Sequence, residues 1–147
     1  MGQRPKRPDN HRRRDMPRPI HFDLGATDPA RAIAFYKAAF GWTVEKWNGP
    51  YEYYLITTGV PSEPGIDGGL APSKDGGVET NLTLGVALLE DVTARVTAAG
   101  GSVVGDIHTI PGVGRIVNCK DTEGNGFSLI EEQRPDTHLE LGEMSGV

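Results

Sequence analysis

The sequence has little of what secreted and membrane-spanning proteins need. Its 147 residues include one cysteine, Cys119, so no internal disulfide can form and a reducing compartment is expected. No apolar run approaches the roughly 20 residues that span a bilayer. No apolar segment follows the basic N-terminus, as one would in a signal peptide. We therefore expect a cytoplasmic protein without a membrane partner, in which Cys119 is a buried, inert thiol.

Charge is unevenly distributed along the chain. Residues 1–15 hold six basic and two acidic residues, a balance of +4; because the whole chain carries −5, the remainder carries −9. Binding of nucleic acid requires a cationic surface, so we expect no nucleic-acid partner for this acidic body. Residues 1–18 lack apolar side chains to bury and are expected to form a disordered basic arm. The alternative is an arm that itself contacts nucleic acid or another anionic surface.

Two stretches in which polar and apolar residues alternate organise the rest of the chain, residues 20–26 and 80–86. Side chains alternate between the two faces of a strand, so each stretch predicts a strand with one apolar and one polar face. The predicted apolar faces carry Phe22, Leu24, Leu82, Leu84 and Val86. The predicted polar faces carry His21, Asp23, Asn81 and Thr83. An amphipathic helix should cover each apolar face, which leaves the polar faces to line a site.

The same order of elements follows each of these strands. Helices are predicted over residues 29–40 and 89–99, where apolar residues recur with helical spacing. Further strands are predicted over residues 42–47, 51–58 and 65–71, and over residues 102–108, 113–120 and 125–132. The sequence therefore predicts two βαβββ modules, residues 19–72 and 79–133, within one domain spanning residues 19–133. Residues 134–147 are expected to form a tail that is either disordered or a short helix.

Three sequence motifs make the chain resemble a known protein superfamily. They are His21-Phe22-Asp23-Leu24, the helix end Phe35-Tyr36 with Phe40-Gly41-Trp42, and the turn Asp121-Thr122-Glu123-Gly124-Asn125. Together with the duplicated unit, they resemble the vicinal oxygen chelate superfamily, which includes glyoxalase I, bleomycin-resistance proteins, fosfomycin-resistance enzymes and extradiol dioxygenases. The resemblance implies an α+β fold in which the two modules form a cupped, mostly antiparallel sheet with the helices on its outer face. It also implies a homodimer.

The resemblance further implies where a divalent metal would bind. Metal enzymes of the superfamily place one ligand on the first and one on the last strand of each half. Carried over position by position, these four places hold His21, Asn81, Ser128 and either Gly68 or Gly69. A catalytic metal needs about three protein ligands, so this pattern predicts a depleted metal site in which His21 is the one good ligand. A different register would bring in Asp67 or Glu79.

We therefore expect a small-molecule-binding protein that resembles the glyoxalase and bleomycin-resistance proteins. The residues expected to contact the small organic ligand are His21, Asp23, Asn81, Thr83, Ser128 and Tyr54. The same polar lining could instead surround water or a dimer contact. His21 is also the candidate general base, because histidine titrates near neutral pH. The aromatic residues of the first hairpin, Trp42, Trp47, Tyr53 and Tyr54, could stack on a ligand or belong to the core.

Two other functions stay open. The first is a metal-dependent enzyme of the same superfamily, resembling lactoylglutathione lyase or a dioxygenase and using a divalent metal cofactor. The second is a protein-interaction module that binds no small ligand.

Overall fold

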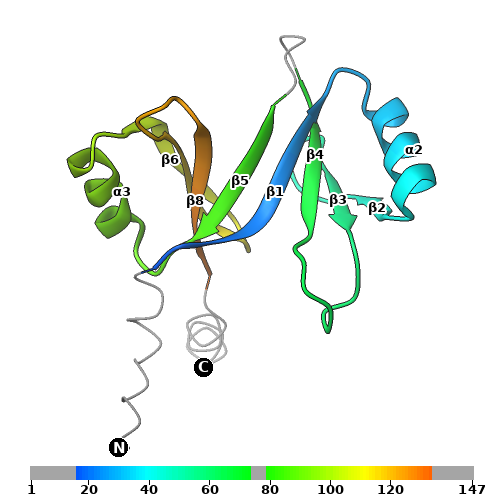
Figure 1. Ribbon diagram of the computed structural model, residues 1–147, viewed down its shortest axis with the longest axis horizontal. Coiled ribbons are helices and arrows are strands. Elements are labelled where there is room, and N and C mark those ends of the chain that lie inside the picture. The colour runs from blue at the N-terminus through cyan, green and yellow to red at the C-terminus, as the bar shows by residue number, and fades with distance from the viewer. Residues whose placement is uncertain (1–15, 74–78, 134–147) are drawn as a thin grey trace, which may run out of the picture. The chain divides into compact units, whose positions relative to one another are not determined.

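The computed structural model describes residues 16–73 and 79–133. The expectations for the basic arm and for the C-terminal tail lie almost entirely outside these residues. The elements follow in the order β1 (Arg18–Ala26), α2 (Pro29–Phe40), β2 (Thr43–Lys46), β3 (Tyr54–Thr57), β4 (Gly68–Pro72), β5 (Thr80–Gly85), α3 (Leu89–Ala98), β6 (Ser102–Ile110), β7 (Gly114–Lys120) and β8 (Gly126–Glu132) (Figure 1). This α+β fold of two βαβββ modules confirms the predicted fold class.

The contacts divide the chain into two compact units. Pro19–Thr83 is called here the first unit, and the described residues from Leu84 onward belong to the second unit. Strand β5 passes from one unit to the other, because Thr83 and Leu84 are consecutive residues within it. Within the described residues, no helix is long and apolar enough to cross a membrane.

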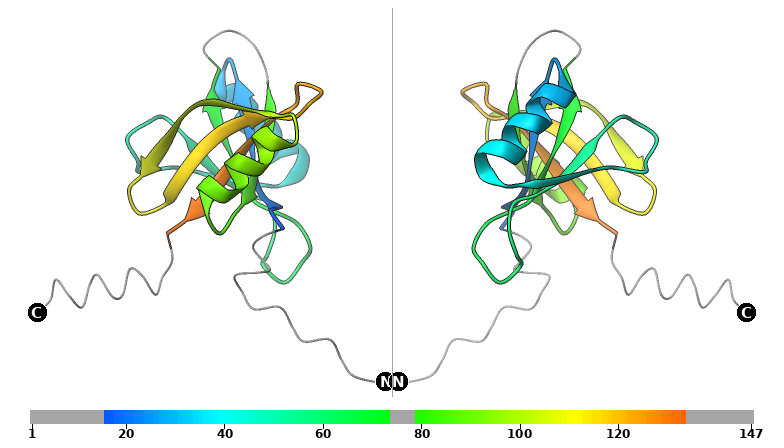
Figure 2. Two further views of the ribbon diagram at one scale, coloured as in Figure 1. Left: turned by 90° about the vertical axis from the view of Figure 1, so that its left-hand side faces the viewer. Right: turned by 90° about the vertical axis from the view of Figure 1, so that its right-hand side faces the viewer.

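In the first unit the strands lie in the order β2-β3-β4-β1-β5. The pairs β2–β3 and β3–β4 are antiparallel, whereas β1 and β4 are parallel, so the sheet is mixed. Helix α2 packs on one face of this sheet (Figure 2, right). Ala26, Ile56 and Leu70 are the buried centre of the core there, and Phe22 and Leu24 pack against them. The predicted apolar face of β1 is therefore confirmed, and His21 and Asp23 occupy the opposite face.

The second unit repeats this arrangement with its own core. Strands β8, β7 and β6 are joined as antiparallel neighbours. Helix α3 lies against these strands (Figure 2, left). The buried residues of this core are Val86, Leu89, Val92, Val117, Cys119 and Leu129. Cys119 is a free thiol, and burial raises its pKa, which fits the predicted inert role.

The two helices begin in different ways. Helix α2 is capped by the residue that precedes it, because the Asp28 carboxylate accepts a hydrogen bond from the Arg31 amide at 3.1 Å. Helix α3 follows Leu88, whose side chain cannot cap it. Glu131 of β8 takes that role instead, and its Oε1 accepts from the Leu89 amide at 2.9 Å. A helix end that lacks a local cap is thus completed by a distant strand.

The predicted bounds differ most around β3 and β4. The expected strand at residues 51–58 is reduced to Tyr54–Thr57, and the one at 65–71 begins only at Gly68. The loop between them is closed by Asp67, whose carboxylate accepts from the Thr58 amide at 2.9 Å. Leu82 also departs from prediction, since 43% of it is exposed although it was assigned to the apolar face of β5.

Candidate functional site

The polar face of the first unit brings three side chains into one hydrogen-bonded group. His21 and Asp23 extend from β1, and Tyr53 lies just before β3. The Tyr53 hydroxyl donates to Asp23 Oδ1 and lies 2.8 Å from His21 Nε2. His21 Nε2 is 3.6 Å from the same Asp23 oxygen. We call this group the His21–Tyr53–Asp23 cluster.

A glycine on β4 makes room for this cluster. Asp23 and Leu55 are both register partners of Gly69, one on each side of β4. A Cβ atom added to Gly69 would lie 1.7 Å from the Tyr53 hydroxyl oxygen, well inside van der Waals contact. Gly68 serves the opposite face, where an added Cβ would lie 2.4 Å from the ring of Phe22. The paired glycines therefore admit a phenol on the polar face and a phenyl ring on the core face.

The electrostatics of the cluster favour an ionised Asp23 and a neutral Tyr53. Burial raises the pKa of Asp23, but the interactions with His21 and Tyr53 outweigh it, so the pKa of Asp23 lies below its ordinary value. Burial is the main cause that raises the pKa of Tyr53, and the negative charge of Asp23 raises it further. Tyr53 is therefore a hydrogen-bond donor to a carboxylate over the whole neutral pH range.

Thr83 of β5 is the most deeply buried polar residue beside this cluster. Only 3% of Thr83 is exposed, and among the described residues its hydroxyl has no hydrogen-bond partner. It lies near enough to Asp23 to lower the pKa of that carboxyl, although the pair does not reach hydrogen-bonding geometry. A buried hydroxyl without a partner is uncommon in folded proteins and calls for an explanation.

The remaining expected site residues lie in different surroundings. Asn81 is half-buried on β5, in the first unit. Tyr54 packs against the core of the first unit, and its hydroxyl donates to Glu52 at 2.7 Å. Ser128 belongs to the second unit, where its hydroxyl donates to Asn118 Oδ1 at 2.8 Å. The residue that the expected set lacked is Tyr53, because selecting it over Tyr54 requires the register of β3 against β4, which no local pattern in the sequence supplies.

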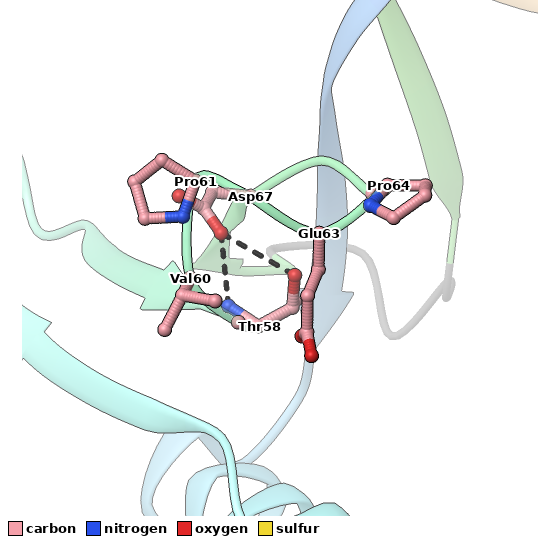
Figure 3. A pocket seen from close by; sticks show the side chains of 8 residues that line it. Thr58, Val60, Pro61, Glu63, Pro64 and Asp67 are labelled. Carbon is pink, nitrogen blue, oxygen red and sulfur yellow. Dashed lines mark hydrogen bonds between the residues drawn. The ribbon is translucent and has the colours of Figure 1, made fainter.

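The residues around His21 do not fit a divalent metal. Within residues 16–73 and 79–133, no three His, Cys, Asp or Glu side chains are grouped as metal ligands. The position on β4 where a ligand would stand is Gly69, and the Tyr53 hydroxyl occupies the adjoining space. Asp67, the alternative ligand, is held by Thr58 in the β3–β4 loop, beside a hollow lined by Val60, Pro61, Glu63 and Pro64 (Figure 3). Glu79, the other alternative, is exposed.

Fold and motifs together place this chain in the vicinal oxygen chelate superfamily. More narrowly, it belongs to the glyoxalase-like domain family, whose sequence profile matches residues 19–130. No curated protein matches the chain in sequence.

Solved structures with this fold include methylmalonyl-CoA epimerase from Mycobacterium tuberculosis, with 16% identity, a TM-score of 0.62, and coverage of 82% of this chain and 91% of that one. A hypothetical protein from Bacillus halodurans C-125 has 10% identity, a TM-score of 0.63, and coverage of 80% and 96%. The Streptomyces coelicolor methylmalonyl-CoA epimerase in complex with 2-nitronate-propionyl-CoA has 19% identity, a TM-score of 0.59, and coverage of 80% and 98%. At these identities, the likeness shows the fold alone.

Proposed function

We propose that this protein binds a small organic molecule on the polar face of its first unit, without the help of a metal ion. The observation that carries this proposal is the buried hydroxyl of Thr83, which lies beside the His21–Tyr53–Asp23 cluster and has no hydrogen-bond partner within residues 16–73 and 79–133. Leaving a buried hydroxyl without a partner costs about 1–3 kcal/mol. A ligand that hydrogen-bonds to Thr83 would recover that free energy when it binds.

The cluster supplies the polar groups that such a ligand site needs. Ligand sites combine a few well-placed polar groups with a rigid scaffold. His21 and Asp23 keep about a third of their side-chain surface exposed, at 31% and 33%, so both are accessible while held in place. Asn81 belongs to the same proposed site through its position on β5. Ser128 and Tyr54, which the sequence also suggested, are excluded from this proposal because each is engaged elsewhere.

The test is a thermal-shift screen of the purified full chain after treatment with a chelator. The probes are a set of small organic alcohols, amines, amides and acids, together with methylmalonyl-CoA, which is bound in one methylmalonyl-CoA epimerase structure. We expect a chelator-resistant rise in Tm that is lost in Thr83→Val and His21→Ala. Thr97→Val is the matched control, because Thr97 is exposed on α3 and its hydroxyl already bonds to Thr93.

Two results would overturn the proposal. The first is a Tm rise of the same size in Thr83→Val as in Thr97→Val. The second is the absence of any Tm rise across the probes. A stoichiometric metal, found by elemental analysis and required for the Tm rise, would instead favour the metal-dependent lyase or dioxygenase.

A further inference from the structure

We infer that Tyr53 and Asp23 hold the neutral imidazole of His21 with its proton on Nε2, and that the ligand of this face is a hydrogen-bond donor such as an amine, amide or alcohol. The part concerning the ligand rests on the proposed function. The part concerning His21 stands on the geometry of the cluster alone.

The position of the protons follows from counting donors. A phenol has one proton to donate, and Tyr53 donates it to Asp23 Oδ1. An ionised carboxylate has no proton to give in return. His21 Nε2 lies 2.8 Å from the Tyr53 oxygen, and that oxygen can now only accept. The His21 Nε2–H must therefore be the donor, so the chain of hydrogen bonds runs from His21 through Tyr53 to Asp23.

This arrangement leaves His21 Nδ1 as an acceptor. In a neutral imidazole one ring nitrogen carries the proton and the other carries a lone pair. No residue in the described part of the chain bonds to Nδ1, and 31% of the His21 side chain is exposed. Tyr53 is thus a positioning residue, because it acts on the ligand only by fixing which nitrogen of His21 is presented.

The groups that His21 and Asp23 present to the ligand are then both acceptors. Tyr53 and His21 both approach Asp23 at Oδ1, so its Oδ2 adds a second acceptor and a negative charge. Thr83 contributes a buried hydroxyl that has no hydrogen-bond partner among the described residues. A carboxylate ligand would meet like charge and two lone pairs, both of which are unfavourable. A ligand with N–H or O–H groups would satisfy Nδ1 and Oδ2 together, and one with an acceptor group as well would also satisfy Thr83.

The first experiment measures the tautomer of His21 without any ligand. The full chain, labelled with nitrogen-15 in its histidines, is examined by two-bond proton–nitrogen correlation NMR near pH 8, about 1.5 units above the ordinary histidine pKa. The chain has four histidines, and His21→Gln identifies the signals of interest by their loss. We expect His21 to show a protonated Nε2 and an unprotonated Nδ1. A protonated Nδ1 on His21 of the wild-type protein would overturn the inference.

A matched pair of variants then tests the role of Tyr53. Among the described residues, Tyr53 is the one acceptor within hydrogen-bonding distance of Nε2–H, so its removal in Tyr53→Phe should leave the two tautomers of His21 more evenly mixed. Tyr51→Phe is the control, because Tyr51 is 58% exposed and, in the described part of the chain, its ring contacts Trp47 alone, so the His21 spectrum should not change. An unchanged His21 spectrum in a folded Tyr53→Phe protein would contradict the positioning role.

The second experiment tests the ligand class with three probes of one shape, benzylamine, benzyl alcohol and benzoate. We expect the amine and the alcohol to shift the His21 ring signals in the wild-type protein, and benzoate to have a smaller effect. A larger shift from benzoate, or no shift from any probe, would overturn the assignment of the ligand class. The tautomer result is independent of all three probes, so failure of the ligand-binding proposal and failure of the tautomer inference are distinguishable.

Discussion

Among the described residues, each unit has one buried hydroxyl-bearing residue, and the two hydroxyls have opposite surroundings. Thr83 in the first unit is 3% exposed and has no partner among the described residues, whereas Ser128 in the second unit is 4% exposed and donates to Asn118. The modules share one order of elements, so the backbone does not account for the difference. The contrast teaches that duplication preserved the scaffold while the side chains on it took separate roles.

The charged groups show the same division. In the first unit, His21, Asp23 and Tyr53 form a half-buried cluster on the polar face of the sheet. In the second unit, Arg115 donates to Glu90 at 2.7 and 2.8 Å and to Glu131 at 2.6 Å, next to the start of α3. Glu131 in turn accepts from the first amide of that helix. The charges of the second unit thus complete a helix end, while those of the first bond to one another through Tyr53 on the polar face of the sheet.

The largest loss of stability is expected from Gly69→Ala, which would disrupt the His21–Tyr53–Asp23 cluster of the first unit. The new methyl group would overlap the Tyr53 hydroxyl, so Tyr53 must leave the cluster. We expect a loss of about 1–3 kcal/mol in the free energy of unfolding, the usual cost of overpacking, measured by urea denaturation. The tautomer preference of His21 should disappear as well.

Gly59→Ala is the matched control, because its added Cβ would lie 3.4 Å from the flexible side chain of Glu63. Equal stability of the Gly69→Ala and Gly59→Ala proteins would contradict the close approach of Tyr53 to β4.

The next effect concerns the cap of α3. Glu131→Ala removes the acceptor of the Leu89 amide and one partner of Arg115, and we expect a loss of about 2 kcal/mol in the free energy of unfolding. Asp28→Ala, which removes the local cap of α2, should cost about 1 kcal/mol. Urea denaturation measures both. Glu132→Ala, at the exposed end of β8, is the control, and a loss there equal to that of Glu131→Ala would argue against the distant cap.

A smaller pair of effects tests the two buried hydroxyls directly. Ser128→Ala removes a hydrogen bond and leaves Asn118 Oδ1 without that donor, so the free energy of unfolding should fall by about 1 kcal/mol. Thr83→Val removes a hydroxyl that has no partner, so stability without ligand should stay level or rise by about 1 kcal/mol. Equal losses in the two variants, measured by urea denaturation, would show that Thr83 is satisfied in the folded protein.

The smallest effect is a change in the dependence of stability on pH. The pKa of Asp23 is lowered in the folded state, so its contribution is present above the unfolded value of about 3.9 and is lost as pH falls through the lower folded value. Asp23→Asn should therefore decline less steeply in stability on acidification. Asp121→Asn should do likewise, because hydrogen bonds from Asn125 lower the pKa of Asp121. Only Asp23→Asn should alter the His21 spectrum, and a spectral change in both variants would contradict the division between the units.

Several parts of the fold could be read from the sequence because the interactions that form them are local. The helix predicted over residues 29–40 is α2 to the residue, since Asp28 caps it and Gly41 ends it with a φ of 75°. The turn at residues 121–125 is likewise closed by its own side chains, with Asp121 accepting from the amides of Glu123 and Asn125. The faces of β1 followed from alternation, which placed His21 and Asp23 together.

Other parts depend on residues far apart in the sequence. The choice of Tyr53 over Tyr54 required the register of β3 against β4. The loop between these strands is held by Asp67, and β3 and β4 both begin later than the sequence predicts. The cap of α3 is Glu131, which lies 42 positions from Leu89, so no local sequence pattern predicts it.

The sequence by itself thus determined the duplicated βαβββ order, the two helices and the polar face of β1, because alternation, helical spacing and capping act between near neighbours. Only the tertiary structure decided what His21 and Asp23 are bonded to. It brought Tyr53, which is 30 residues from Asp23 and 32 from His21, into the space left by Gly69. It also buried Thr83 without a hydrogen-bond partner among the described residues. The physical reason is that strand register, which sets these distances, is fixed by the packing of the whole unit and by no single segment.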